Sequence, residues 1–247
     1  MKQRLAVPCK ACPLRKLDVF KPASADQIEF IQQFKADHQS HEAGAILIRE
    51  GATQANLMTL FDGLAFRYKT LSDGRRQILN FLFPGDLIGL QESTDPMVAA
   101  HGVEALTAVQ VCLFSRDRLW DLYRSHPELG FDVTWLSAHE ERMVDDNLLT
   151  VGRRSARERV AVLVLHLHKR AQSLGLVVDQ TMDFPFNQQM IADALGLSLV
   201  HTNKTLRRLR HDGLFELADG RLRLLDGHAL ASLADYYDSI EPQRPLI

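Results

Sequence analysis

The spacing of apolar residues changes twice along the chain, and each change marks a change of structure. Ser24 precedes a helical spacing over residues 26–35 and is expected to cap that helix. Over residues 44–115 the period becomes two, and turns such as Asp62-Gly63 separate the short apolar segments. From Arg116 onward the spacing is helical again. The pattern predicts a β-sandwich or barrel followed by a helical region.

A long helix is predicted over residues 128–152. Its first half is expected to pack on the β domain through Leu129, Phe131, Val133, Trp135 and Leu136. In its second half Val144, Leu148 and Val151 recur at steps of four and three, which is typical of a coiled-coil seam and predicts a dimer interface. The alternative is that both sets are core of one chain. Glu141 lies three residues before Val144 on the same seam. In a dimer it would be buried beside its own copy, and such a pair of like charges would weaken the dimer.

Residues 187–211 form the most informative stretch. Two short amphipathic helices are predicted, joined by a tight turn at Leu195-Gly196-Leu197, with Ser198 as the cap of the second helix. The predicted inward stripe of that helix is Leu199, Thr202, Leu206 and Leu209. Its other faces carry Val200, His201, Asn203, Lys204, Arg207, Arg208 and Arg210. Such a basic face suits the major groove of DNA, although a solvated helical hairpin would also carry charge.

The segments that follow favour the DNA-binding interpretation. Residues 214–217 and 221–224 alternate around Asp219-Gly220, a dipeptide typical of a β-hairpin turn. A helix-turn-helix followed by a β wing is much more specific than a charged hairpin. A helix over residues 155–175 is expected to open this domain and a helix over residues 226–238 to close it, and the tail with Pro242 and Pro245 is expected to fray.

Composition limits the possible classes of protein. The chain has 247 residues, 46% of them hydrophobic, which is enough for two modest domains. Its net charge is -2, so any attraction to nucleic acid must be local. No apolar run reaches the length of a membrane span and no signal-peptide core is present, so a cytoplasmic location is expected. The sequence shows no nucleophile-base-acid set and no phosphate-binding loop, so it gives little support for an enzyme.

Three local motifs and the order of the predicted parts resemble the Crp/Fnr superfamily of bacterial transcription regulators. The motifs are Gly85-Asp86-Leu87-Ile88-Gly89, Ser155-Ala156-Arg157-Glu158-Arg159-Val160-Ala161 and Ala194-Leu195-Gly196-Leu197-Ser198. The resemblance implies an α+β chain with an arm (residues 1–22), a cyclic-nucleotide-binding-like β jelly roll (23–126), a dimerisation helix (127–153) and a winged helix (154–247). It also implies a homodimer on a palindromic operator and RNA polymerase as a partner.

The resemblance does not extend to the residues that bind a cyclic nucleotide. Receptors of this fold use an acidic residue and an Arg-Ser pair after the glycine-rich turn, and the corresponding positions here hold Leu90 and Ala99-Ala100. A buried phosphate without an arginine would be an unpaired charge, which is costly. We therefore expect no cyclic nucleotide.

The cysteines suggest a different signal. In the oxygen-sensing branch of the superfamily, three cysteines of an N-terminal arm and one on a late strand hold an iron-sulfur cluster. Cys9, Cys12 and Cys112 match three of these ligands, and Asp18 stands where the fourth would be. The resemblance implies a 4Fe-4S cluster with Asp18 as a weak fourth ligand.

Other interpretations of the same residues stay open. The thiols could form a zinc site or a disulfide switch, and Cys112 could be a buried apolar residue and Asp18 a solvated charge. The protein could also sense a small molecule, or act on a partner protein without binding DNA. Haem ligation by His38, His41 or His101 is a minor alternative, since Pro13 follows the cysteine pair and a haem-attachment motif is absent.

The resemblance also suggests roles on the second helix of the helix-turn-helix. Val200 and Lys204 occupy the usual base-contacting positions, so Val200 could touch a thymine methyl group and Lys204 could donate to guanine. Asn203 could pair with adenine, and Arg207, Arg208 and Arg210 are expected at phosphates. The predicted DNA-contacting set is Ser198, Val200, His201, Asn203, Lys204, Arg207 and Arg208.

Overall fold

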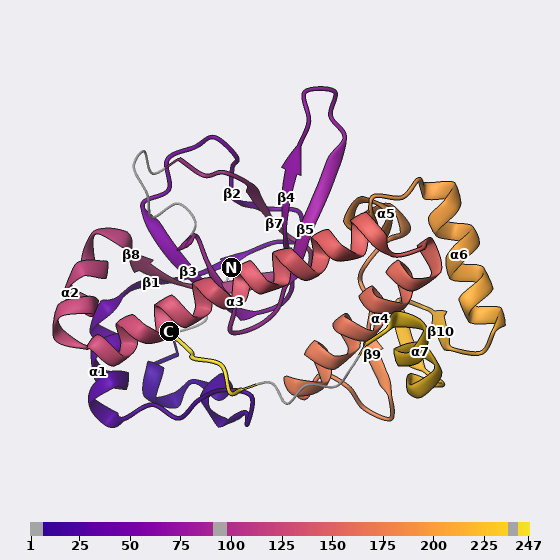
Figure 1. Ribbon diagram of the computed structural model, residues 1–247. Coiled ribbons are helices and arrows are strands. Elements are labelled where there is room, and N and C mark those ends of the chain that lie inside the picture. Colours follow the sequence, from indigo (N-terminus) through magenta and orange to yellow (C-terminus); the bar gives the residue numbers. More distant parts are fainter. Residues whose placement is uncertain (1–6, 91–97, 237–241) are drawn as a thin grey trace. The chain divides into compact units, whose positions relative to one another are not determined.

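The computed structural model describes residues 7–90, 98–236 and 242–247 (Figure 1). The chain forms two compact units, which we call the first and the second unit. The first comprises Met1–Arg67, Phe81–Glu141 and Pro242–Ile247, and the second comprises Tyr68–Asn80 and Arg142–Glu241. Among the described residues, none of the helices combines the length and the apolar composition that a membrane crossing requires.

A double-sheet β roll makes up most of the first unit, as the period-two pattern predicts, although residues 68–70 and 76–80 of two of its strands belong to the second unit. Its strands are β1 Lys35–His41, β2 Ile46–Ile48, β3 Asn56–Asp62, β4 Ala65–Thr70, β5 Arg76–Leu82, β6 Leu87–Ile88, β7 Gly102–Ala105 and β8 Val109–Ser115. The two sheets have the orders β1-β8-β3-β6 and β2-β7-β4-β5. Alternate residues of both sheets enclose an apolar core that includes Leu60, Val103 and Val111, all fully buried.

Strand β1 was not predicted. The helix before it, α1 (Ala25–Phe34), ends one residue earlier than expected, and β1 follows at once. The strand contains no large apolar residue, so its sequence lacks the alternation that indicates a strand. It forms because it lies at the edge of its sheet and pairs with β8 alone, from Lys35 opposite Phe114 to His41 opposite Val109.

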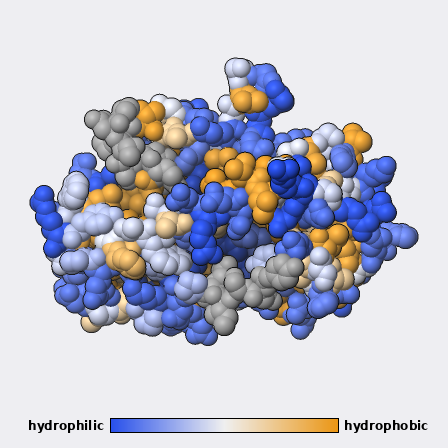
Figure 2. Space-filling view, in the orientation of Figure 1, coloured by the Kyte–Doolittle hydropathy of each residue, from blue (hydrophilic) through white to orange (hydrophobic). Residues whose placement is uncertain are grey.

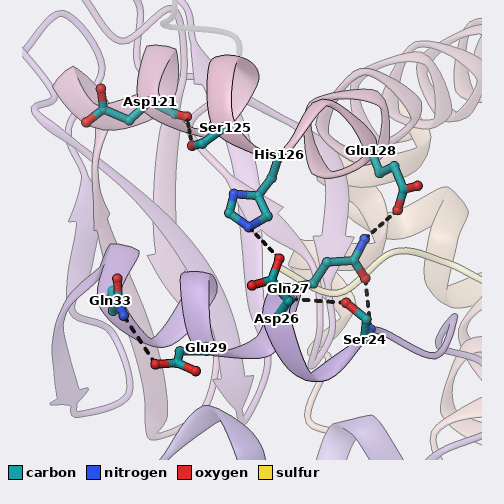
Figure 3. Close-up of polar contacts among 9 residues, drawn as sticks. All are labelled: Ser24, Asp26, Gln27, Glu29, Gln33, Asp121, Ser125, His126 and Glu128. Atoms are coloured by element: carbon teal, nitrogen blue, oxygen red, sulfur yellow. Dashed lines mark hydrogen bonds and ion pairs between the residues drawn. The ribbon is translucent and has the colours of Figure 1, made fainter.

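Short helices surround this roll: η1 Cys9–Ala11, η2 Pro13–Lys16, α1, η4 Arg116–Arg118 and α2 Leu119–Ser125. The predicted cap of α1 is confirmed, since Ser24 and Gln27 form a capping box. The same Gln27 donates from Nε2 to Glu128 Oε2 at 2.9 Å, and His126 Nε2 lies 3.1 Å from Asp26 Oδ2 (Figure 3). These contacts dock the start of α1 against the start of the long helix.

That long helix, α3 (Pro127–Arg153), contributes to both units. Leu129, Val133 and Leu136 are buried against the roll, as predicted. The prediction for Phe131 was wrong, because its side chain is 67% exposed. Phe131 is two residues from Leu129 and from Val133, and residues two apart on a helix face different directions.

The second unit contains α4 Ala156–Ser173, β9 Thr181–Asp183, α5 Gln188–Leu195, α6 Leu199–His211, β10 Phe215–Ala218, β11 Arg221–Leu224 and α7 Gly227–Ala234. Ser155 and Glu158 form a capping box at the start of α4. Strands β10 and β11 pair antiparallel, and β9 adds an unpredicted third strand beside β11. The predicted helix-turn-helix with a wing is confirmed.

The expectation that the tail frays was wrong. Residues 242–247 are packed on the first unit, and Arg244, Leu246 and Ile247 are all buried. The prolines suggested an irregular segment, which is correct, but irregular backbone can still be held by long-range hydrogen bonds that a local pattern does not reveal.

Candidate DNA-binding face and cysteine site

The turn between α5 and α6 is set by three local features. Asn187 caps α5 by accepting a hydrogen bond from Met190 N at 2.9 Å. Gly196 ends the helix in the left-handed conformation, with φ of 61°, which favours glycine. Ser198 caps α6 by accepting from His201 N at 3.2 Å. The turn chemistry predicted from the sequence is thus present, and the Ser198 hydroxyl acts within the protein.

The buried face of α6 differs in part from the predicted stripe. Thr202, Leu206 and Leu209 are buried as expected, whereas Leu199 is 41% exposed. Leu199 is the first residue of the helix, where the chain has only just left the turn. Thr205 is buried in addition, and its hydroxyl donates to His201 O at 2.8 Å, which satisfies the polar group internally. Its spacing of three from Thr202 could have identified it.

The opposite face of α6 is open and basic. Val200 is 79% exposed, and the exposed residues that share this face are His201, Lys204, Arg207, Arg208 and Arg210. Asn203 is half-buried, and its Oδ1 has no hydrogen-bond partner within the described residues. Of the predicted base-contacting residues, Val200 and Lys204 are therefore the most accessible and Asn203 is less so.

Long-range contacts hold this face in place, and local sequence patterns do not reveal them. Arg159 on α4 donates from Nη1 to Leu195 O at 2.9 Å, which satisfies a carbonyl at the end of α5. Arg157 forms a 2.6 Å ion pair with Asp212, just after α6. The tip of the β4–β5 hairpin, which belongs to the same unit, adds a hydrogen bond of 3.0 Å from Gln77 Nε2 to Ala194 O.

The wing is a regular two-residue hairpin. Ala218 lies opposite Arg221, and Asp219 and Gly220 between them both have positive φ, at 52° and 69°. This is the conformation that a type I′ turn requires and that the Asp-Gly pair favours. Arg221 and Arg223 are solvent-exposed on β11 and form ion pairs with Asp183 and Glu216, so the wing adds no net positive charge to that of α6.

The three cysteines lie in the first unit. Cys9 is buried on η1, Cys12 is half-buried where η2 begins, and Cys112 is half-buried on β8. The amide of Cys9 donates to Gln32 Oε1 at 2.6 Å, which fastens the arm to α1. Cys112 lies opposite His38 in the β1–β8 pair, and its Sγ is 3.9 Å from His38 Nδ1.

The pKa values of the cysteines show that their charges interact. Burial, with smaller contributions from the charges of Cys9 and Cys12, raises the pKa of Cys112 to about 11. Burial also raises the pKa of Cys9. Lys35 opposes both shifts, and its Nζ lies 3.4 Å from His38 Nδ1. The sequence did not single out Lys35.

The arrangement does not match a metal site. The donor chemistry of three thiols suits a soft metal or an iron-sulfur cluster. Within residues 7–90, 98–236 and 242–247, however, no group of three or more His, Cys, Asp or Glu side chains is placed to hold a metal ion. Asp18 is fixed through its backbone carbonyl, which accepts from Gln243 Nε2 at 2.8 Å. The described residues therefore do not by themselves form a metal site.

Apolar side chains also lie exposed on the second half of α3. Val144, Leu148 and Leu149 are 51%, 67% and 50% exposed, and a patch of apolar surface lies over the middle of α3 in Figure 2. Glu141 is exposed and Val151 is half-buried. Exposed apolar residues in a row on one helix are typical of an interaction surface.

Comparison with known proteins identifies the family. Residues 38–126 match the cyclic nucleotide-binding domain and residues 158–233 match the Crp-like helix-turn-helix domain. The nitrogen fixation regulation protein FixK of Bradyrhizobium diazoefficiens is 30% identical over 92% of this chain and 93% of its own length. The transcriptional activator protein FnrL of Cereibacter sphaeroides is 27% identical over 86% of each chain.

The chain belongs to the Crp/Fnr family. It is therefore a DNA-binding transcription regulator. The crystal structure of FixK2 from Bradyrhizobium japonicum resembles it with a TM-score of 0.73 and 27% identity, covering 83% of this chain and 99% of that one. The Crp/Fnr fold predicted from the sequence is confirmed, whereas the ligand of its sensor domain must be inferred from the residues present.

The pKa of Cys112 leads to a test of its surroundings. In the folded, reduced protein, iodoacetamide at pH 8 should alkylate Cys112 about a hundredfold more slowly than in urea-unfolded protein, because the thiolate is the reacting form. Since the pKa is raised, the rate should climb with pH until about pH 11. Mass spectrometry of the digested protein measures this rate. A rate that does not change between pH 8 and pH 10 would contradict the raised pKa of Cys112.

Proposed function

We propose that this Crp/Fnr regulator acts as a homodimer on a palindromic operator, with one α6 in each half-site. The observation that carries this proposal is the open face of α6, on which Val200 and Lys204 are exposed among several arginines. A palindrome follows from the twofold symmetry of a dimer, which presents the same face to two half-sites one helical turn apart.

The chemistry of α6 suggests which bases are contacted. Lys204 donates to guanine, and Val200, which has no hydrogen-bonding side chain, contacts a thymine methyl group. His201 and Asn203 flank these positions. Arg207 and Arg208 bind phosphates, which sets the affinity and its salt dependence more than the sequence preference. Ser198 contributes through the helix start that it caps, where free amides favour a phosphate.

The dimer interface is assigned to the second half of α3. Val144, Leu148 and Val151 form the seam, supported by the exposure of the first two. Glu141 at the edge of the seam would meet its own copy, and two like charges close together oppose association. Dimerisation would then depend on what offsets this repulsion.

The sensing element is assigned to Cys9, Cys12 and Cys112. The effect of Cys9 and Cys12 on the pKa of Cys112, and the position of Lys35, whose Nζ lies 3.4 Å from His38 Nδ1, support a role in redox or oxygen sensing. An iron-sulfur cluster, probed by the experiment below, would take these three thiolates, with Asp18 as the fourth ligand. Zinc binding, a disulfide and a small-molecule effector are the alternative signals.

No cyclic nucleotide is proposed as a ligand. Ala99, at the expected phosphate position, is 2% exposed and belongs to the apolar core of the roll. Arg67, a buried arginine of β4, is already paired with Glu140 of α3. The proposal includes a cytoplasmic location, where a DNA-binding regulator can reach its operator. It also includes RNA polymerase as a partner.

The base-contact proposal predicts different effects for two basic residues. Lys204→Ala should weaken binding to the cognate operator by about 1–3 kcal/mol and flatten its base preference. Arg208→Ala should weaken binding to all sequences to a similar degree and reduce the salt dependence. Binding-site selection and titrations at several salt concentrations measure both effects. An unchanged preference after Lys204→Ala would remove that residue from the base contacts.

The dimer proposal predicts opposite effects for two substitutions on α3. Leu148→Glu should weaken the dimer at least tenfold, because it places a like-charge pair in an apolar seam, whereas Glu141→Ala should strengthen it. Sedimentation equilibrium measures both constants. Phe131→Glu is the matched control, since Phe131 is exposed on the same helix but lies outside the seam. A dimer unaffected by Leu148→Glu would place the interface elsewhere.

The sensor proposal is tested by purification without oxygen. If a cluster binds, wild-type protein should contain iron and sulfide and absorb visible light, and Cys112→Ala should lose most of this signal. Asp18→Ala then tests the fourth ligand. Colourless, iron-free wild-type protein would overturn the cluster and leave the thiols themselves, or a small molecule, as the sensor.

A further inference from the structure

Residues 242–247 follow the DNA-binding part of the chain in sequence, yet they belong to the first unit. Their backbone pairs with the cysteine arm. Arg244 N donates to Val19 O and Lys21 N donates to Arg244 O, both at 2.8 Å, which makes a short parallel bridge opposite Phe20. A segment that pairs its backbone in this way is held in one register.

The strongest side-chain contact of this segment is a buried ion pair. Arg244 Nη2 bonds to Asp86 Oδ1, and the two side chains are only 10% and 1% exposed. Asp86 also accepts a hydrogen bond from Phe83 N at 2.9 Å through its other oxygen, so it shapes the turn before β6. Without Arg244, the Asp86 carboxylate would lose its ion-pair partner inside the protein, which is unfavourable. The Asp86 carboxylate therefore provides a specific binding partner for residues 242–247.

The end of the segment lies in the core beside a cysteine. Ile247 is 6% exposed and belongs to the same apolar cluster as Cys9. Thr59 Oγ1 donates to Ile247 O at 2.8 Å, and Arg15 of the arm donates to Leu246 O at 3.3 Å. The arm that carries Cys9 and Cys12 thus forms part of the surface on which the tail docks.

Docking has a consequence for the rest of the chain. Residues 237–241 are all that connect the second unit to the docked segment. Even fully extended, that connection spans only about 20 Å. While the tail is docked, the second unit is tethered at both of its ends, through α3 and through the tail. When the tail is released, the connections through α3 and through the β4–β5 hairpin remain.

We propose that residues 242–247 form a strap that docks on the cysteine arm and the β roll, and that the state of the arm controls how tightly it docks. The strap restricts the second unit while it is docked, so its release changes operator affinity. This last step rests on the proposed DNA-binding function, whereas docking itself does not.

Hydrogen exchange in the full-length protein tests docking. The Arg244 amide, which donates to Val19 O, should exchange slowly in the wild type, and Arg244→Met should speed exchange at this position at least tenfold while the amides of β3 and β8 stay protected. Arg75→Met, which removes an arginine with a 77% exposed side chain, is the matched control and should change nothing. Because Arg244→Met removes the ion-pair partner of Asp86, the double variant Arg244→Met, Asp86→Asn separates tail release from general destabilisation. Wild-type tail amides that exchange like an unstructured peptide would overturn the strap.

Coupling to the arm is tested in the same way. Cys9→Asp places a charge in the cluster that holds Ile247 and should speed exchange of the tail, whereas Cys9→Ala should have little effect. Equal tail exchange in these two variants would overturn the coupling. Operator affinity in Arg244→Met should differ at least threefold from that in Arg75→Met, and equal affinities would overturn the regulatory role. If no variant binds DNA, the proposed function fails while the exchange result still decides docking.

Discussion

A buried ion pair between Arg67 and Glu140 fixes the long helix on the β roll. On β4 the first unit ends at Arg67. On α3 it ends at the residue that follows Glu140. Both charges have left water, so each needs the other, and the pair permits one register of helix against strand. Such a pair adds little to stability compared with an apolar contact, but it discriminates strongly against a shifted helix. The faces that α3 presents, including the proposed dimer seam, depend on this register.

Much of the remaining architecture is determined by local chemistry, which is why the sequence predicted it. Capping boxes start α1 and α4, side-chain caps start α5 and α6, and a left-handed glycine ends α5. The Asp219-Gly220 turn sets the register of the wing. Each of these features involves residues within four positions of one another, so a single stretch of sequence contains all the information.

Features that depend on distant residues could not be predicted. Strand β1 is polar and forms only because β8 offers a free edge. The tail is ordered by contacts with Val19, Lys21 and Asp86, more than 150 residues away. Helical spacing likewise does not show where a helix leaves the core, which explains the error at Leu199, whereas Phe131 simply departs from the spacing of Leu129 and Val133. The same distinction applies to the candidate sites. The open face of α6 could be predicted from the spacing of its residues, whereas the surroundings of the cysteines could not.

Those surroundings restrict how the cysteines can respond to a signal. Cys112 is half-buried between β strands and holds its proton up to about pH 11, so as a free thiol it is nearly inert near neutral pH. The pKa of Cys9 is raised by burial as well. A response that needs thiolates must therefore begin with an event that stabilises negative charge, such as metal binding, or at Cys12, which is less buried than Cys9. Among the described residues, Lys35 lowers the pKa of both Cys9 and Cys112 and Arg15 also lowers that of Cys9, so neighbouring cations partly offset the effect of burial on these thiols.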